Sequence, residues 1–178
     1  MDGQYNYHNC QSLFGYARKV HHRSGGICQL CGAGDALDVD FNLWRQLTVE
    51  HLIGESQGGY INRIKPIIDR RFPELSNSDR EAMAMQIDEA NTVTACSFCN
   101  AMTSRVRNPE TMEQLIMGYE DDHVGLVNFM VQKLQRILEQ KRRDVSWKLV
   151  SIKDAFEKEV KPELIDARHN RRATIAGE

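Results

Sequence analysis

Two Cys-x-x-Cys units, Cys28–Cys31 and Cys96–Cys99, constrain this chain more than any other feature. Two cysteines three residues apart at a tight turn can face one metal ion, and two such pairs complete a tetrahedral set of thiolates. The pairs lie far apart in the sequence, so a shared ion must bring distant segments together. We therefore expect one structural Zn²⁺ site formed by Cys28, Cys31, Cys96 and Cys99.

The composition is that of one globular domain. The chain has 178 residues, of which 41% are apolar and 27% charged, enough to bury a core. No apolar stretch is long enough to span a membrane, and the N-terminus lacks the pattern of a signal peptide. We expect a cytoplasmic protein without membrane contact, in which paired cysteines bind metal and do not form disulfides.

Alternating apolar residues predict short strands around the first cysteine pair. Two strands are expected at 39–43 and 47–51, and Glu50 and His51 lie at the end of the second. A β-prone run at 92–95 leads directly into the second cysteine pair.

Apolar residues three and four apart predict helices elsewhere. The expected helices are an N-terminal one over 13–20, a helical insertion over 60–90 with a capping box at 78–81, a helix beginning at Asn108-Pro109, a long one over 124–138, and one over 149–160 that ends near Pro162. The long helix carries a narrow apolar seam. Such a seam serves either an intramolecular core or a homodimer through the C-terminal helices.

Together these residues resemble the HNH endonuclease family, in the branch whose ββα-metal fold is held by four cysteines. The resemblance is carried by Glu50-His51, Ser56-Gln57-Gly58-Gly59, Asn91, and the run from Cys96 to Asn100. It covers about residues 26–107. The fold it implies is α+β, with a zinc-stapled ββα core, the helical insertion at 60–90, and helical N- and C-terminal extensions, the latter over 108–165.

The resemblance also implies roles for four residues. His51 would be the general base, because a neutral imidazole can take a proton from water near pH 7. Asn91 would orient that imidazole. Glu50 and Asn100 would offer oxygen ligands to a catalytic Mg²⁺ or Mn²⁺. The family more often has Asp in place of Glu50, and Ser104 stands where some members have a further His.

The charge distribution bears on the substrate. The formal net charge of −2 lacks the basic excess usual for a nucleic-acid-binding protein, yet basic residues cluster locally. Candidates for phosphate contacts are Arg63, Lys65, Arg70 and Arg71 in the insertion, and Arg105 and Arg107 after Asn100. The resemblance implies a metal-dependent endonuclease that cuts DNA. The alternatives are a non-catalytic zinc-ribbon module that binds nucleic acid or protein, and an RNA-cutting nuclease on the same core.

Overall fold

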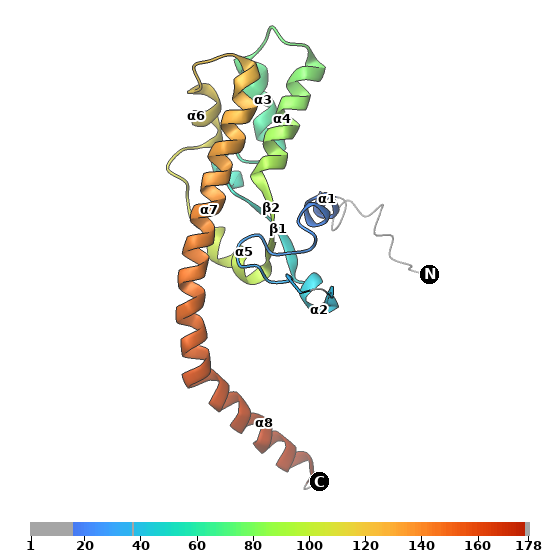
Figure 1. Ribbon diagram of the computed structural model, residues 1–178, viewed down its shortest axis with the longest axis vertical. Helices are drawn as coiled ribbons and strands as arrows, with labels where there is room; N and C mark the ends of the chain where they lie inside the picture. The colour runs from blue at the N-terminus through green and yellow to red at the C-terminus, as the bar shows by residue number, and fades with distance from the viewer. Residues whose placement is uncertain (1–15, 37, 177–178) are drawn as a thin grey trace, which may run out of the picture.

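A computed structural model describes residues 16–36 and 38–176 and shows an α+β, mostly helical protein built on a two-stranded sheet (Figure 1). In chain order the elements are α1 (Tyr16–Arg23), α2 (Phe41–Trp44), β1 (Leu47–His51), the 3₁₀ turn η2 (Glu55–Gln57), α3 (Ile61–Arg71), α4 (Asn77–Asn91), β2 (Thr92–Cys96), α5 (Ser97–Thr103), α6 (Met112–Met117), α7 (His123–Ala155), the π-helical turn η3 (Phe156–Val160) and α8 (Lys161–Ala176). Over these residues no helix has the length and apolar character needed to cross a membrane.

The centre of the fold is a ββα unit. β1 pairs antiparallel with β2, so that Leu47 lies opposite Cys96 and His51 opposite Thr92. α5 begins at Ser97, directly after β2, and packs on both strands. The α+β class expected from the sequence is therefore confirmed.

The strand predicted at 39–43 is wrong, because its centre is the short helix α2. The Asp40 carboxylate caps this helix by accepting a hydrogen bond from the Leu43 N–H at 2.7 Å. Val39 and Phe41 are exposed, so their alternation marks no buried face of a sheet. The strand that pairs with β1 comes instead from β2, more than 40 residues later in the chain.

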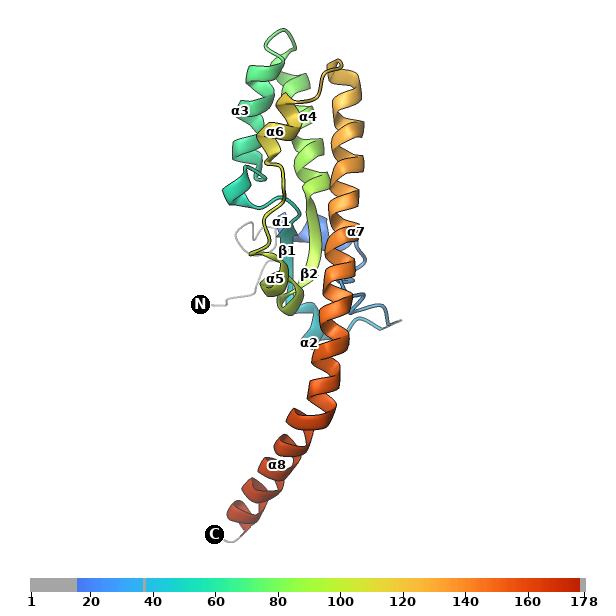
Figure 2. The ribbon, with the colours of Figure 1, turned by 90° about the vertical axis from the view of Figure 1, so that its left-hand side faces the viewer.

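The insertion forms a pair of packed helices, α3 and α4, as expected (Figure 2). Ile64, Ile68 and Ile87 bury the contact between them. α4 begins earlier than the predicted capping box, because the Ser76 hydroxyl accepts from the Asp79 N–H at 3.1 Å and caps the helix.

The C-terminal helices differ most from expectation. α6 is capped by Thr111 and not by Asn108. α7 buries Leu126, Leu134 and Leu138 against the body, whereas Val124 and Val131, two members of the predicted seam, are exposed. The predicted end near Pro162 is also wrong. Pro162 directly follows the π-helical turn η3, whose wider turn accommodates the proline, and the helix continues as α8.

Candidate metal centre and the adjoining histidine site

The four cysteines meet at one point beside the ββα unit. The sulfurs of Cys28, Cys31, Cys96 and Cys99 all lie within 4.8 Å of one another. Four thiolates about 2.3 Å from one zinc ion would lie about 3.8 Å apart, close to the 4.0 Å between Cys31 Sγ and Cys96 Sγ. The cluster is mostly buried and could hold a zinc ion.

Two local features shape this cluster. The first pair lies on a turn that positive-φ glycines allow, with Gly32 at +77°. The second pair starts α5, and the Cys96 N–H donates to Cys28 Sγ at 3.3 Å. Burial raises the pKa of the Cys31 thiol to about 11 and also raises the pKa of Cys99. A bound cation is therefore what would keep these thiols deprotonated.

His51 lies at the end of β1 and its ring stacks on Tyr60, with centroids 4.0 Å apart. Burial, and then the positive charge of Lys141, lower the pKa of His51 to about 4. The imidazole is thus neutral at physiological pH, which is the form that can accept a proton.

Asn91 ends α4 and is fully buried. Its Nδ2 donates to the carbonyls of Ile53 at 3.0 Å and Gly59 at 2.7 Å, and its Oδ1 accepts from the Ile53 N–H at 2.8 Å. These bonds fix the loop after His51. Asn91 therefore clamps this loop, and its expected role in orienting the imidazole remains a prediction.

The second glycine of the Ser56–Gly59 loop is required by this clamp. A Cβ on Gly59 would lie 1.6 Å from the Ile53 carbonyl oxygen and 2.9 Å from Asn91 Nδ2. Gly58 has a different role, since it ends η2 in the left-handed conformation at φ +82°.

Glu50 is buried beside His51 and holds a partner that the sequence did not reveal. Lys141 Nζ, from α7, lies 2.5 Å from Glu50 Oε1, and both side chains are at most 7% exposed. The Thr103 hydroxyl donates to the same oxygen at 3.0 Å. The carboxylate predicted to bind metal is therefore already paired with a positive charge. A divalent ion would have to displace the ammonium group of Lys141. Lys141 belongs to a local cluster of basic residues at 141–143, but nothing in that pattern marks it as the partner of Glu50, because it comes from a helix outside the motif.

Asn100 faces the same site from α5. Its Nδ2 donates to the Thr48 hydroxyl at 2.9 Å, which fixes the amide. Glu50, His51, Asn100, Ser104 and Lys141 all line one hollow of about 190 Å³. The structure thus brings together three of the four residues assigned from the resemblance, while Asn91 is absent from the lining and bonds to the loop after His51.

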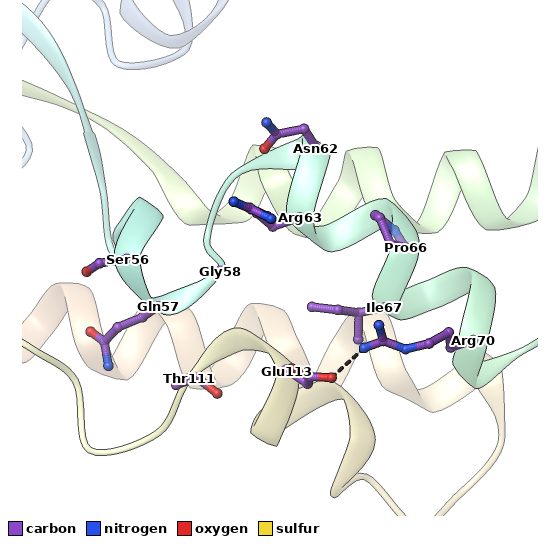
Figure 3. A pocket seen from close by; sticks show the side chains of 10 residues that line it. All are labelled: Ser56, Gln57, Gly58, Asn62, Arg63, Pro66, Ile67, Arg70, Thr111 and Glu113. Atoms are coloured by element: carbon purple, nitrogen blue, oxygen red, sulfur yellow. Dashed lines mark hydrogen bonds and ion pairs between the residues drawn. The ribbon is translucent and has the colours of Figure 1, made fainter.

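The basic residues of the insertion are mostly occupied. Lys65 pairs with Glu81 at 2.5 Å, Arg70 pairs with Glu113, and Arg71 donates to the Tyr119 carbonyl at 2.9 Å. Arg63 is exposed and lines a second hollow of about 320 Å³ between α3 and the 55–58 loop, together with Arg70 (Figure 3).

Another groove adjoins the histidine site, with which it shares Val106 and Lys141. It has a volume of about 330 Å³ and includes Arg107 and Arg136 in its lining. Arg136 was missed in the sequence because it is one basic residue among many on α7. The loop that carries Arg107 is held in place by Asn108, whose Nδ2 donates to the Leu52 carbonyl at 2.8 Å. Arg105 is exposed on the same loop and is absent from the lining of this groove.

Comparison with known proteins adds no assignment. No known protein family, no curated protein and no solved structure matches the chain.

Proposed function

We propose that this protein is an HNH-type endonuclease that hydrolyses phosphodiester bonds in DNA. The observation that carries the proposal is the hollow shared by Glu50, His51 and Asn100, built on a strand–strand–helix unit next to four clustered cysteines. Glu50 and His51 are neighbours on β1, whereas Asn100 comes from α5, so the convergence of Asn100 with the other two is a property of the fold.

In this proposal His51 is the general base. Its neutral ring accepts a proton from the attacking water, and stacking on Tyr60 restricts its orientation. The clamp of Asn91 on Ile53 and Gly59 holds the backbone next to this ring. Lys141 places a positive charge beside the site, where negative charge develops on the phosphate.

The oxygen ligands present suit a hard divalent cation. Glu50 offers a carboxylate and Asn100 an amide oxygen in the same hollow. Mg²⁺ or Mn²⁺ bound there would stabilise the scissile phosphate and the leaving oxygen. The zinc site has a separate, structural role, because four thiolates leave no open position for substrate.

We place the DNA backbone in the groove lined by Arg107 and Arg136. It meets the histidine site at Val106 and Lys141, so a phosphate backbone lying in it would continue into the hollow. Two of its basic residues, Arg107 and Arg136, have no ion pair among the described side chains, unlike Lys65 and Arg70 in the insertion.

The test is cleavage of plasmid DNA, single-stranded DNA and RNA by the purified full chain in chelator-free buffer, with Mg²⁺, Mn²⁺ or neither. Wild-type protein should cut DNA, and His51→Ala should lose about 10²-fold to 10⁴-fold in rate. His22→Ala, which changes an exposed histidine, is the matched control and should keep full activity.

Other outcomes select the alternatives. Binding of DNA without cleavage under any condition would favour the non-catalytic zinc-ribbon module. Preferential cleavage of RNA would support the same catalytic site in an RNA-cutting nuclease. An active, folded His51→Ala protein would remove His51 from the mechanism.

A further inference from the structure

The C-terminal helix leaves the body of the protein and carries an uncovered apolar face. Figures 1 and 2 both show α7 running past the ββα unit and α8 continuing with no other helix or strand of the described residues beside it. Every residue from 150 to 169 is exposed. We call residues 150–169 the arm.

Four apolar side chains follow one line along the arm. Ile152, Phe156, Val160 and Leu164 are exposed by 44%, 42%, 43% and 48%. In a regular α-helix a spacing of four residues drifts by about 40° at each step. The π-turn η3, from Phe156 to Val160, absorbs one extra residue and cancels the drift of one step. With one of the three steps cancelled, the total drift is about 80°, so the four side chains stay on one face of the helix and form a single stripe.

This stripe continues the face of α7 that packs on the body. Val145 is 1% exposed and Leu149 packs against the core, and both lie in line with Ile152. The face is thus built for burial over its whole length, from Val145 to Leu164. The spacings from Val145 to Phe156 are four, three and four residues, as in a heptad pattern, and they continue at four residues to Leu164. An apolar face of this length is typical of a helix that packs along another helix.

We propose that the arm binds the arm of a second copy of this chain in an antiparallel pair centred on Phe156. In this arrangement Phe156 meets the second copy's Phe156, and Ile152 meets the second copy's Val160. Both copies thereby cover the stripe with an identical stripe, which a two-fold axis requires.

Charge complementarity selects the antiparallel orientation. Residues 146–153 carry two lysines and no acidic residue, a net charge of +2. Residues 159–166 carry three acidic residues and one lysine, a net charge of −2. An antiparallel pair centred on Phe156 places these two segments opposite each other twice. A parallel pair would place each segment against its own copy, with like charges facing.

Sedimentation equilibrium of the full chain tests the pairing. The wild-type chain of 20.4 kDa should sediment as a dimer of twice that mass. Phe156→Glu and Ile152→Glu should each give a monomer. Val150→Glu is the matched control, since Val150 is 71% exposed and lies off the stripe, and it should remain a dimer. Zinc content and circular dichroism of the variants check that the body is folded.

Charge reversal tests the orientation. Lys148→Glu with Lys153→Glu should raise the dimer Kd by more than about tenfold, and adding Glu159→Lys with Glu163→Lys should restore it. A parallel pair predicts no effect of the first change, because like charges face each other before and after it. A monomeric wild type, a dimeric Phe156→Glu variant, or no rescue by the combined reversal would each overturn the proposal.

Discussion

Lys141 reaches the ββα unit from a helix 91 residues further along the chain and places its ammonium group on the Glu50 carboxylate. Both side chains are buried, so removal of either one would leave the other as an uncompensated charge away from water and would destabilise the fold. Glu50 therefore needs some cation. In this structure Lys141 provides it, and in the proposed enzyme a divalent ion would compete for the same oxygen.

Lys141→Met tests this competition. Without the ammonium group, Glu50 is buried without a counter-ion, and the free energy of unfolding should fall by about 3–5 kcal/mol. Mn²⁺ should restore part of the loss, measured as melting temperature in chelator-free buffer. The matched control is Lys133→Met, whose partner Glu110 is 46% exposed, and its cost should stay below about 1 kcal/mol. A Lys141→Met protein that Mn²⁺ does not stabilise would show that Glu50 takes no divalent ion.

Gly59→Ala tests the loop clamp. The added Cβ would collide with the Ile53 carbonyl and push on Asn91, so the change should cost about 1–3 kcal/mol in urea denaturation. Gly54→Ala is the control in the same loop. Gly54 has a φ of −72° and open space around its Cβ position, and its substitution should shift stability by no more than about 0.5 kcal/mol. Equal effects of the two changes would contradict the clamp.

At the scale of elements, α1 is docked on β2 by a buried polar contact. His21 Nδ1 lies 3.0 Å from the Thr94 hydroxyl, and His21 is only 7% exposed. Burial lowers the pKa of His21 below its ordinary value of 6.5. Between the lowered pKa and 6.5 the unfolded chain binds more protons than the folded chain. The stability due to neutral His21 is therefore complete above pH 6.5 and is lost as the pH falls toward the lowered pKa.

His21→Gln should flatten this dependence while keeping a polar partner for Thr94. The measurement is the melting temperature at about pH 7.5 and about pH 5.5, where the wild type should lose more stability on acidification than the variant. His22→Gln changes an exposed neighbour and should behave like the wild type. If His21→Gln and the wild type lose the same amount, His21 does not sense this pH range.

The cysteine cluster joins the turn after α1 to the start of α5, and zinc should hold these elements together. Elemental analysis should find one zinc per chain. Binding of a structural zinc is worth on the order of 10 kcal/mol, comparable with the whole stability of a domain, so Cys96→Ser should unfold the ββα unit. Ser97→Ala changes the exposed next residue and should remain folded. A folded Cys96→Ser protein without zinc would contradict the structural role.

At the scale of the whole molecule, the sequence predicts what local chemistry determines. The cysteine cluster, β1, β2 and the helical insertion follow from spacing and periodicity. The strand predicted at 39–43 is wrong because alternation alone cannot tell an exposed segment from a sheet. Lys141 and Arg136 could not be found, because their roles depend on how α7 packs against elements about 90 and 30 residues away. The helix end predicted at Pro162 is wrong because a π-turn accommodates the proline.

The path proposed for DNA on the molecule gives the last prediction. Two hollows near the site contain arginines, one Arg107 and Arg136 and the other Arg63 and Arg70, and acidic residues also line both. Arg70 is already paired with Glu113, whereas the first hollow opens into the histidine site. Removal of each side chain that binds a phosphate should reduce the slope of log K against log salt by about 0.9.

Arg107→Ala with Arg136→Ala should therefore lower the salt slope of DNA binding by about two, measured by fluorescence anisotropy over a range of salt concentrations. Arg63→Ala with Arg70→Ala removes the same formal charge from the other hollow and is the matched control, so it should change the slope little. Equal slopes for both double variants would mean that the removed charge acts only through the overall field. A flattened slope for the Arg63 and Arg70 variant alone would place DNA along α3 and leave the groove beside α7 for another partner.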